Sequence, residues 1–352
     1  MSTMKASVHF DQGADKFQVK EFDMPVADEN RSVIKIAYAG ICGSDLHNTL
    51  KPIAGPDWVL GHEFSGTISE ASPNLPEGLK IGDRVVVNPI ENCGTCPACK
   101  AGLPQTCMSN LYMSPGFTSA TKGGYAQYAS VRNDRMIKLP DNVSFEEATL
   151  VEPIAVAFRA VRKSGTKAGD SVVVIGGGIV GAYCCCFAKM QGAKFVALVE
   201  KNTEKGQQIV DWGYADQVFQ ADDPELVQKL QAANGGEYDV GFDAYGGGKC
   251  IDNCIYTVKH GGNIMLVGLD MYGENGVPSL CVAVLFDQNL LGSMEYTLDE
   301  FALVLELIAS GKIQVRQCVS GIIGLNEIPE TFTRLLSRET KEVKILIDPF
   351  KE

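Results

Sequence analysis

Hydrophobic positions follow two different patterns along the chain, and the change falls near residue 150. Before that point, short runs rich in β-branched residues are interrupted by Gly, Pro and Asp, as in Ser32–Tyr38, Arg84–Asn88 and Tyr125–Val131. Such runs predict the short strands of an irregular, β-rich domain. A helical spacing of apolar residues begins near Glu146 and marks the end of this first part.

From Ser171 onward, apolar runs of strand length alternate with amphipathic stretches of helix length. The predicted strands are Ser171–Ile175, Phe195–Val199, Tyr238–Asp243 and Asn263–Val267, and the predicted helices are Ile179–Gln191, Thr203–Trp212, Pro224–Ala233 and Lys249–Lys259. This alternation predicts a parallel sheet with helices on both faces. Beyond residue 290, two further helices and a closing strand are expected at Leu298–Ala309, Asn326–Leu336 and Val343–Ile347.

Composition narrows the class of protein. The length of 352 residues suggests about two domains, and a hydrophobic content of 45% is ordinary for a globular chain. No apolar run reaches the roughly 18 residues that span a bilayer, and the first residues do not resemble a secretory signal. A net charge of −12 argues against nucleic acid as a partner, because such binding depends on clustered Lys and Arg. Twelve cysteines without a secretory signal indicate a reducing cytoplasm, where thiols bind metals rather than form disulfides.

Four of these cysteines lie within fifteen residues, in a stretch punctuated by Gly and Pro. They are Cys93, Cys96, Cys99 and Cys107. Four thiolates at this spacing can surround one Zn²⁺ tetrahedrally. Such a closed site leaves no position for a substrate, so we expect a structural zinc that holds a loop. A disulfide pair is the alternative, and a reducing location argues against it.

A nucleotide site is expected where the alternating pattern begins. Gly176, Gly178 and Gly181 fit G-x-G-x-x-G, with Ile179 and Val180 between the last two glycines. The motif follows a predicted strand and opens a predicted helix, which is the context that a dinucleotide-binding loop requires. Its glycines allow a tight turn and bring backbone N–H groups close to a pyrophosphate at the helix N-terminus.

An acidic residue at the end of the next strand favours NAD over NADP. Glu200 follows Gly181 by nineteen residues, where a carboxylate accepts hydrogen bonds from the adenosine ribose and repels a 2′-phosphate. Lys201 and Lys205 lie nearby and oppose this interpretation, since either could pair with a phosphate.

A second metal site is expected near the N-terminus. Cys42 and His62 offer a thiolate and an imidazole, which are both good zinc ligands. Glu63 or Glu152 could supply a third protein ligand and leave the fourth position open, as a catalytic zinc needs. Taken singly, Cys42 and His62 are more often core residues. The Cys₄ stretch and the nucleotide motif in the same chain favour the metal-binding interpretation.

Taken together, these motifs resemble those of the zinc-containing medium-chain alcohol and polyol dehydrogenases over essentially the whole chain. The resemblance is carried by Gly40–His47, Gly61–Glu63, Lys80–Val85, the Cys₄ stretch, Gly123–Ala126, Val151–Pro153 and Gly176–Gly181. It implies an α/β protein in which a Rossmann domain with a doubly wound parallel sheet, residues 153–290, is inserted into a GroES-like, β-rich catalytic domain. That catalytic domain is expected to comprise residues 1–152 together with 291–352. The pair Glu152-Pro153 is similar to the sorbitol, threonine and galactitol-phosphate dehydrogenase branch, and Val267-Gly268 resembles the backbone that lines the nicotinamide.

The resemblance also implies a mechanism and two cofactors, NAD and two zinc ions per chain. Zinc would polarise a substrate hydroxyl while a hydride passes to NAD. Ser44 would take the hydroxyl proton and pass it through a ribose hydroxyl of the cofactor to His47 at the surface. His47 would exchange it with solvent, since an imidazole titrates near neutrality.

The substrate class is expected to be a small polyol or sugar with a secondary alcohol, which the enzyme would oxidise to the ketone. At the position of Glu295, sorbitol dehydrogenases typically carry an arginine. An acidic residue there opposes an anionic substrate and suits a neutral polyol or an amino alcohol. An L-threonine 3-dehydrogenase-like activity is therefore one alternative, and a catalytically silent NAD-binding protein is another.

Assembly is expected from one apolar stretch. Val277–Phe286 is more apolar than a solvated edge should be, and an exposed apolar edge strand pairs readily with a second copy. The resemblance supports such a homodimer and, in the polyol branch, a homotetramer. No membrane partner is expected.

Overall fold

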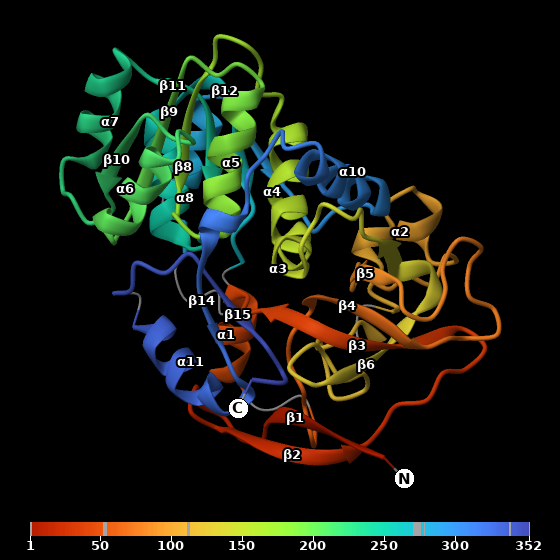
Figure 1. Cartoon of the computed structure of the whole chain (residues 1–352). Helices are drawn as coiled ribbons and strands as arrows, with labels where there is room; N and C mark the ends of the chain where they lie inside the picture. Colours follow the sequence, from red (N-terminus) through yellow and green to blue (C-terminus); the bar gives the residue numbers. More distant parts are fainter. Residues whose placement is uncertain are drawn as a thin grey trace. The chain divides into compact units, whose positions relative to one another are not determined.

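The computed structural model describes residues 2–51, 55–110, 113–269, 276–277, 279–337 and 339–351. The chain forms two compact units, shown with their elements in Figure 1. The catalytic unit comprises Met1–Pro153, Tyr296–Ser337 and Lys344–Glu352, and the nucleotide unit comprises Ile154–Glu295 and Arg338–Val343. No helix in the described residues is long and apolar enough to cross a membrane.

The catalytic unit is built on β-strands. Its strands are β1 (Thr3–His9), β2 (Phe17–Asp23), β3 (Arg31–Gly40), β4 (Glu63–Glu70), β5 (Arg84–Val87), β6 (Tyr128–Arg132), β7 (Met136–Lys138), β14 (Val319–Ile323) and β15 (Lys344–Ile347). Strands β1 and β2 form an antiparallel pair, and the larger sheet runs in the order β14-β15-β3-β4-β5-β7 with β6 paired to β3. Strand β3 has partners along its whole length, and its Ile34, Ile36 and Ala39 side chains are buried in the core of this unit.

The catalytic unit also contains helices. They are α1 (Gly43–Thr49), α2 (Pro97–Lys100), α3 (Phe145–Thr149), α10 (Leu298–Ala309) and α11 (Ile328–Leu336), and α4 (Val151–Ser164) continues into the nucleotide unit. Helix α1 begins directly after Cys42, whose backbone N–H donates to the side chain of Asp45. This capping arrangement satisfies donors that a helix N-terminus otherwise leaves unpaired.

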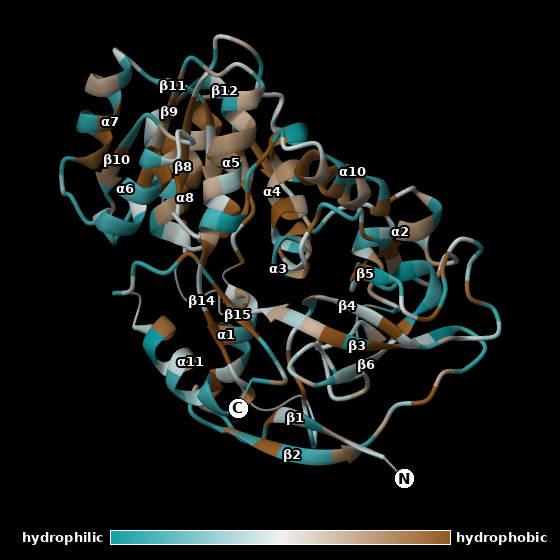
Figure 2. Cartoon of the chain, in the orientation of Figure 1, coloured by the Kyte–Doolittle hydropathy of each residue, from teal (hydrophilic) through white to brown (hydrophobic). Residues whose placement is uncertain are grey.

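The nucleotide unit contains a six-stranded parallel sheet in the order β10-β9-β8-β11-β12-β13. Its elements are β8 (Ser171–Ile175), α5 (Ile179–Met190), β9 (Phe195–Glu200), α6 (Thr203–Asp211), β10 (Gln217–Gln220), α7 (Leu226–Asn234), β11 (Tyr238–Asp243), α8 (Gly248–Thr257), β12 (Val258–Leu266), α9 (Leu280–Leu285) and β13 (Asn289–Gly292). Strands β9 and β10 follow β8 on one side of the sheet, and β11, β12 and β13 follow it on the other. Right-handed crossovers in these two directions place helices on both faces. Every residue of β8 is buried, and Figure 2 shows brown strands between partly teal helices. The fully apolar strand pattern therefore reflects burial on two faces.

One expectation from the sequence is wrong. Val277–Phe286 was expected to form an edge strand, but Leu280–Leu285 is helix α9, and the edge of the sheet is the shorter strand β13. A short apolar run does not distinguish a strand from a helix by its spacing alone. The helix directs Ala283 into the core and leaves Val284 and Leu285 exposed.

The sequence also gave no sign that residues 339–343 return to the nucleotide unit. Two side chains of that unit hold this segment by its backbone. The Asn202 amide donates to the carbonyl of Glu339 at 2.9 Å, and the Gln208 amide donates to that of Lys341 at 3.1 Å.

Candidate active site

The four clustered cysteines converge in the catalytic unit. Their sulfur atoms all lie within 4.8 Å of one another. Individual Sγ–Sγ distances are 3.5 Å for Cys96–Cys99, 3.8 Å for Cys96–Cys107 and 4.0 Å for Cys93–Cys99. Tetrahedral coordination with Zn–S bonds of about 2.3 Å requires about 3.8 Å between sulfurs. The cluster therefore fits one Zn²⁺, and none of the four forms a disulfide.

Local hydrogen bonds act unequally on these thiols. They favour a thiolate at Cys93, whereas at Cys96 the backbone N–H of Cys99 is outweighed by burial and the neighbouring thiols, which raise the pKa of Cys96 to about 11. Backbone N–H groups of Cys93, Cys96 and Cys99 donate to the sulfurs of Cys107, Cys93 and Cys96 at 3.3–3.5 Å. The hydroxyl of Thr95, together with nearby backbone N–H groups, lowers the pKa of Cys93 to about 5. A deprotonated sulfur is the form that binds zinc.

A second group of possible metal ligands lies in the same unit. Ligand atoms of Cys42, His62 and Glu63 lie within 4.8 Å of one another. Cys42 precedes helix α1, and Glu63 opens strand β4 directly after His62. The pairing of Gly40 with Glu63 across β3 and β4 brings these separate stretches together. A thiolate, an imidazole and a carboxylate are a suitable set for a zinc with an open position.

Asp45 and Tyr125 orient the imidazole of His62. An oxygen of the buried Asp45 carboxylate lies 3.5 Å from His62 Nδ1, and the other accepts a hydrogen bond of 2.7 Å from the Tyr125 hydroxyl. Burial acts to lower the pKa of His62, but the charges of Asp45 and Cys42 raise it well above the ordinary value. These surroundings favour a positive charge, which a bound cation also supplies. Asp45 lies in the stretch Gly40–His47, but the sequence did not indicate its role or that of Tyr125.

Lys344 is a further buried partner of the ligand group that the sequence did not reveal. Its ammonium donates to both oxygens of Glu63, at 2.6 and 2.8 Å, and to the carbonyl of Ile41 at 2.9 Å. Burial opposes its charge, but Glu63, Cys42 and Glu152 raise the pKa of Lys344. The cation offsets part of the negative charge of the ligand group.

Glu152 lies outside the ligand group in the described part of the chain. Its side chain is 3% exposed and accepts a hydrogen bond of 2.7 Å from the hydroxyl of Tyr296, which is itself 1% exposed. The charge of Glu152 still acts on Lys344. This places Glu152 near the group without making it one of the three converging ligands.

The two residues expected to move the proton lie on helix α1. Ser44 donates a hydrogen bond of 3.2 Å to Cys42 Sγ, so its hydroxyl lies beside the ligand group. His47 lies near the end of the same helix and is half-buried. The aromatic ring of Phe117 lies 5.3 Å from that of His62 and adds an apolar surface to the site.

The glycine-rich loop in the nucleotide unit has the form that a dinucleotide requires. Helix α5 begins after Gly178, and a Cβ on Gly178 would meet nothing within 4 Å, so its backbone is open to approach. A Cβ on Gly181 would lie 1.8 Å from the carbonyl oxygen of Gly176. Gly176 and Gly181 therefore pack against each other, while Ile179 and Val180 form the first turn of α5.

Glu200 ends strand β9 and contacts this loop. One oxygen of its buried carboxylate accepts from the N–H of Gly177 at 2.6 Å, and the other accepts from Asn202 at 3.0 Å. The Lys205 ammonium lies 3.1 Å from Glu200 Oε1. Glu200 therefore forms an ion pair with Lys205, which is one of the two lysines that could otherwise pair with the 2′-phosphate of NADP.

Val267 and Gly268 follow strand β12 in the same unit. Their backbone N–H groups donate to the carbonyl of Asp243 at 2.9 and 2.8 Å. A Cβ on Gly268 would lie 2.1 Å from the backbone nitrogen of Gly246, so only glycine fits this close approach.

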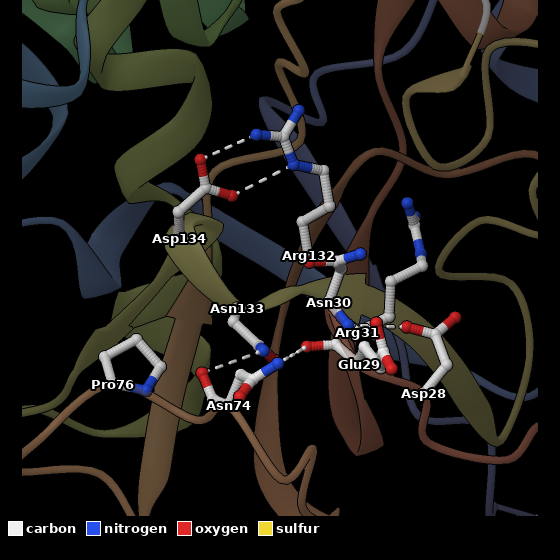
Figure 3. A pocket seen from close by; sticks show the side chains of 9 residues that line it. All are labelled: Asp28, Glu29, Asn30, Arg31, Asn74, Pro76, Arg132, Asn133 and Asp134. Carbon is white, nitrogen blue, oxygen red and sulfur yellow. Dashed lines mark hydrogen bonds and ion pairs between the residues drawn. The ribbon is translucent and has the colours of Figure 1, made fainter.

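A cavity of about 770 Å³ in the catalytic unit is lined mainly by polar residues, none of which is expected at the active site (Figure 3). It is lined by Asp28, Glu29, Asn30, Arg31, Asn74, Pro76, Arg132, Asn133 and Asp134. Most of these side chains are paired with one another or with neighbouring backbone.

Comparison with known families identifies both parts of the chain. Residues 28–141 match the family described as "Alcohol dehydrogenase GroES-like domain", and residues 180–310 match "Zinc-binding dehydrogenase". A probable D-xylulose reductase A of Aspergillus terreus is 30% identical over 343 residues, which cover 94% of this chain and 95% of that protein. The chain belongs to the zinc-binding, medium-chain dehydrogenases.

Solved structures agree with this membership of the medium-chain dehydrogenases. A putative zinc-binding dehydrogenase from Sinorhizobium meliloti, bound to NADP, is 26% identical with a TM-score of 0.89, over 99% of this chain and 100% of that one. The 2R,3R-butanediol dehydrogenase of Bacillus subtilis is 30% identical with a TM-score of 0.82, over 98% and 99%. The expected α/β fold, GroES-like with a Rossmann sheet, is confirmed, and so is the family resemblance.

Proposed function

We propose that this medium-chain dehydrogenase oxidises a secondary alcohol of a small polyol or sugar to the ketone with NAD as hydride acceptor, and catalyses the reverse reaction. The observation that carries the proposal is the convergence of Cys42, His62 and Glu63, in a chain that also holds a glycine-rich nucleotide loop. The names of similar proteins support the substrate class, since they include D-xylulose reductases and a butanediol dehydrogenase.

Two zinc ions per chain belong to this proposal. Cys93, Cys96, Cys99 and Cys107 would hold a structural ion, and Cys42, His62 and Glu63 a catalytic one, with Glu152 nearby. When bound, the catalytic ion supplies Lewis-acid polarisation of the substrate hydroxyl. Asp45 fixes the ring of His62, and Lys344 fixes the carboxylate of Glu63, so both side chains are oriented before substrate arrives.

Ser44 and His47 would carry the proton that leaves the substrate hydroxyl. Ser44 Oγ has a lone pair available while it donates to Cys42, so it can accept the proton of the substrate hydroxyl as its own proton leaves toward His47. His47 would pass the proton to solvent from the same helix, three residues along. Residues at this spacing share one helix face.

NAD is the proposed cofactor because of the chemistry around Glu200. Its carboxylate lies against the glycine-rich loop, where it would accept hydrogen bonds from the adenosine ribose. A 2′-phosphate in that place would meet a buried negative charge. The N-terminus of α5 and Gly176, Gly178 and Gly181 would bind the pyrophosphate. Val267 and Gly268 would contribute backbone near the nicotinamide.

We also propose a homodimer, extended to a homotetramer, and a cytoplasmic location. Strand β13 pairs only with β12 in the described residues, and the neighbouring helix α9 exposes Val284 and Leu285 by 80% and 77%. Large exposed apolar side chains beside an open sheet edge favour pairing with a second copy. Four clustered thiols that are suited to binding zinc fit a reducing compartment.

A screen of NAD reduction tests the proposal. Purified protein, with its zinc content measured, is assayed with polyols, aldoses, inositols and amino alcohols. Turnover of polyols and its loss in Cys42→Ser are expected. Turnover only of L-threonine would favour an amino-alcohol dehydrogenase. NAD binding without reduction by any alcohol would show a catalytically silent protein and contradict the proposal.

A further inference from the structure

Asn92 is held at two points immediately before the first cysteine of the Cys₄ lobe (residues 93–107). Arg132 Nη1 donates to its backbone carbonyl at 3.0 Å. Arg135 Nη2 donates to its side-chain oxygen at 2.7 Å. Hydrogen bonds from a guanidinium are stronger than those between neutral groups. Two charge-assisted hydrogen bonds thus hold Asn92 at the start of the lobe.

The two arginines are themselves held in place. Arg132 makes a bidentate contact with Asp134, at 3.0 and 2.8 Å, which Figure 3 shows along one side of the polar cavity. Arg135 Nη2 also donates to Asp134 at 2.8 Å. Glu91, which is 3% exposed, accepts a bidentate pair from Arg31. Glu91 is therefore connected to strand β3 through Arg31, and the carbonyl of Asn92 to strand β6 through Arg132.

These contacts decide which way the amide of Asn92 faces. A guanidinium only donates, so Arg135 requires the oxygen of the amide on its side. The NH₂ group then points to the lobe, where Nδ2 lies 4.0 Å from Cys99 Sγ. That distance is at the long limit of an N–H···S contact, and it joins Asn92 to one of the four sulfurs. Asn92 also precedes Cys93 in the chain.

We propose that Asn92, oriented by Arg135, is a positioning residue that sets how tightly the Cys₄ lobe retains its zinc. The amide N–H group offsets negative charge on the Cys99 thiolate, and the fixed carbonyl sets the position of Cys93. Partners that surround metal ligands commonly change metal affinity by about 10- to 100-fold when they are removed. The inference rests on the structural zinc of the proposed function.

The test is the rate at which a chromogenic chelator, 4-(2-pyridylazo)resorcinol, removes zinc from full-length protein. The measurements are made in a Cys42→Ser background, so that only the lobe ion is counted. Asn92→Asp keeps an acceptor for Arg135 but loses the N–H donor and adds a negative charge beside the thiolates. Asn92→Ala removes both side-chain contacts. Both variants are expected to release zinc about tenfold faster or more.

Asn133→Asp is the matched control. Asn133 lines the cavity of Figure 3 and is 8% exposed. It forms hydrogen bonds with Ser32 and Asn74 rather than with the lobe. Asn133→Asp makes the same chemical change as Asn92→Asp. It is expected to lower the melting temperature, while its rate of zinc release stays within about twofold of the parent rate. Cobalt substituted for zinc adds a spectroscopic signature, because the sulfur-to-cobalt absorption band should shift in Asn92→Asp and not in Asn133→Asp.

Three results would overturn the inference. Release at the parent rate in Asn92→Asp would mean that the N–H group has no influence on the ion. Equally fast release in Asn133→Asp would mean that general loosening of the unit, not Asn92, governs zinc loss. A parent protein that holds no zinc in its lobe would remove the structural zinc of the proposed function as well, so the two failures are distinguishable.

Discussion

At the scale of single residues, the candidate active site contains buried side chains of opposite charge that lie in pairs. Glu63 and Lys344 are 0% and 3% exposed and lie 2.6 Å apart, while Asp45 faces His62. Buried charges are costly unless they are paired, so each of these groups depends on its neighbour. The catalytic unit thus carries a large desolvation cost at the place where a cation is proposed to bind.

The cofactor preference should depend on Glu200. Replacing it with alanine removes the charge that opposes a 2′-phosphate and frees Lys205 to pair with one. We expect the ratio of kcat/KM for NAD over NADP to fall by about tenfold or more, since about 1.4 kcal/mol corresponds to that factor. The measurement is steady-state kinetics with both cofactors.

Glu204→Ala is the control for this change of charge, because Glu204 is exposed on the next helix. Its cofactor ratio should stay close to that of the parent protein. A parent protein that uses NADP more efficiently would contradict the assignment of Glu200 and point to Lys201 or Lys205.

His9 should make the folded state sensitive to acid. Its ring is fully buried against Phe17 and Trp58, and burial lowers the pKa of His9 despite the carbonyl of Gly13 and the charge of Asp11. An unfolded histidine has a pKa of about 6.5, so below that pH the unfolded state binds more protons. Stability should therefore fall as the pH drops through about 6.5.

Thermal melting of the wild type and of His9→Phe between pH 5 and pH 8 checks this expectation. The difference in melting temperature between the two proteins should shift in favour of His9→Phe as the pH falls. A difference that is constant with pH would show that His9 does not titrate on unfolding.

The residues that could be predicted from the sequence are those whose partners are close along the chain. The four cysteines and the glycine loop are local patterns, and the structure brings the members of each together. Lys344 lies 281 positions from Glu63, and Tyr125 lies 80 from Asp45, so these contacts arise only from tertiary packing. No spacing along the chain could have indicated them.

At the scale of elements, the same limit applies to short apolar segments. The buried strand β8 was predicted because all five residues are apolar or small and lie beside a glycine loop. Helix α9 was mistaken for a strand because six apolar residues fit either structure, and the contacts of Ala283 with the core decide between them. Packing, rather than local preference, determines such an element.

The Cys₄ lobe should behave as an element that depends on its metal. Helix α2 has only four residues, and no residue of it is buried, so packing contributes little to its stability. Cys96→Ser should lose one zinc per chain and lower the melting temperature, because binding of a structural metal supplies folding free energy. Metal analysis together with melting curves would check both effects.

Cys281→Ser is the control for this loss, since Cys281 is an exposed cysteine of helix α9 in the nucleotide unit. It should retain the zinc content of the parent protein. If Cys96→Ser keeps all of its zinc, the lobe does not bind the ion through the four sulfurs.

At the scale of the whole molecule, the open sheet edge and the exposed helix beside it bear on assembly. The exposed side chains of Leu280, Val284 and Leu285 lie on α9, which packs on α8 of the nucleotide unit. Apolar side chains exposed together mark an interaction surface more often than isolated ones do. A two-fold pairing across β13 would bury this surface in both copies and satisfy unpaired backbone groups of the edge strand.

The proposed dimer predicts that a charge on helix α9 separates the subunits. Wild-type protein should have at least twice the chain mass of 37.9 kDa in light scattering at micromolar concentration. Leu285→Glu should shift it toward the single-chain mass, because a buried charge without a partner opposes association. Val26→Glu is the matched control, since Val26 is 73% exposed in the catalytic unit and should leave the mass unchanged. A wild-type protein that is monomeric under these conditions would leave Val284 and Leu285 as ordinary solvated side chains and rule out pairing through β13.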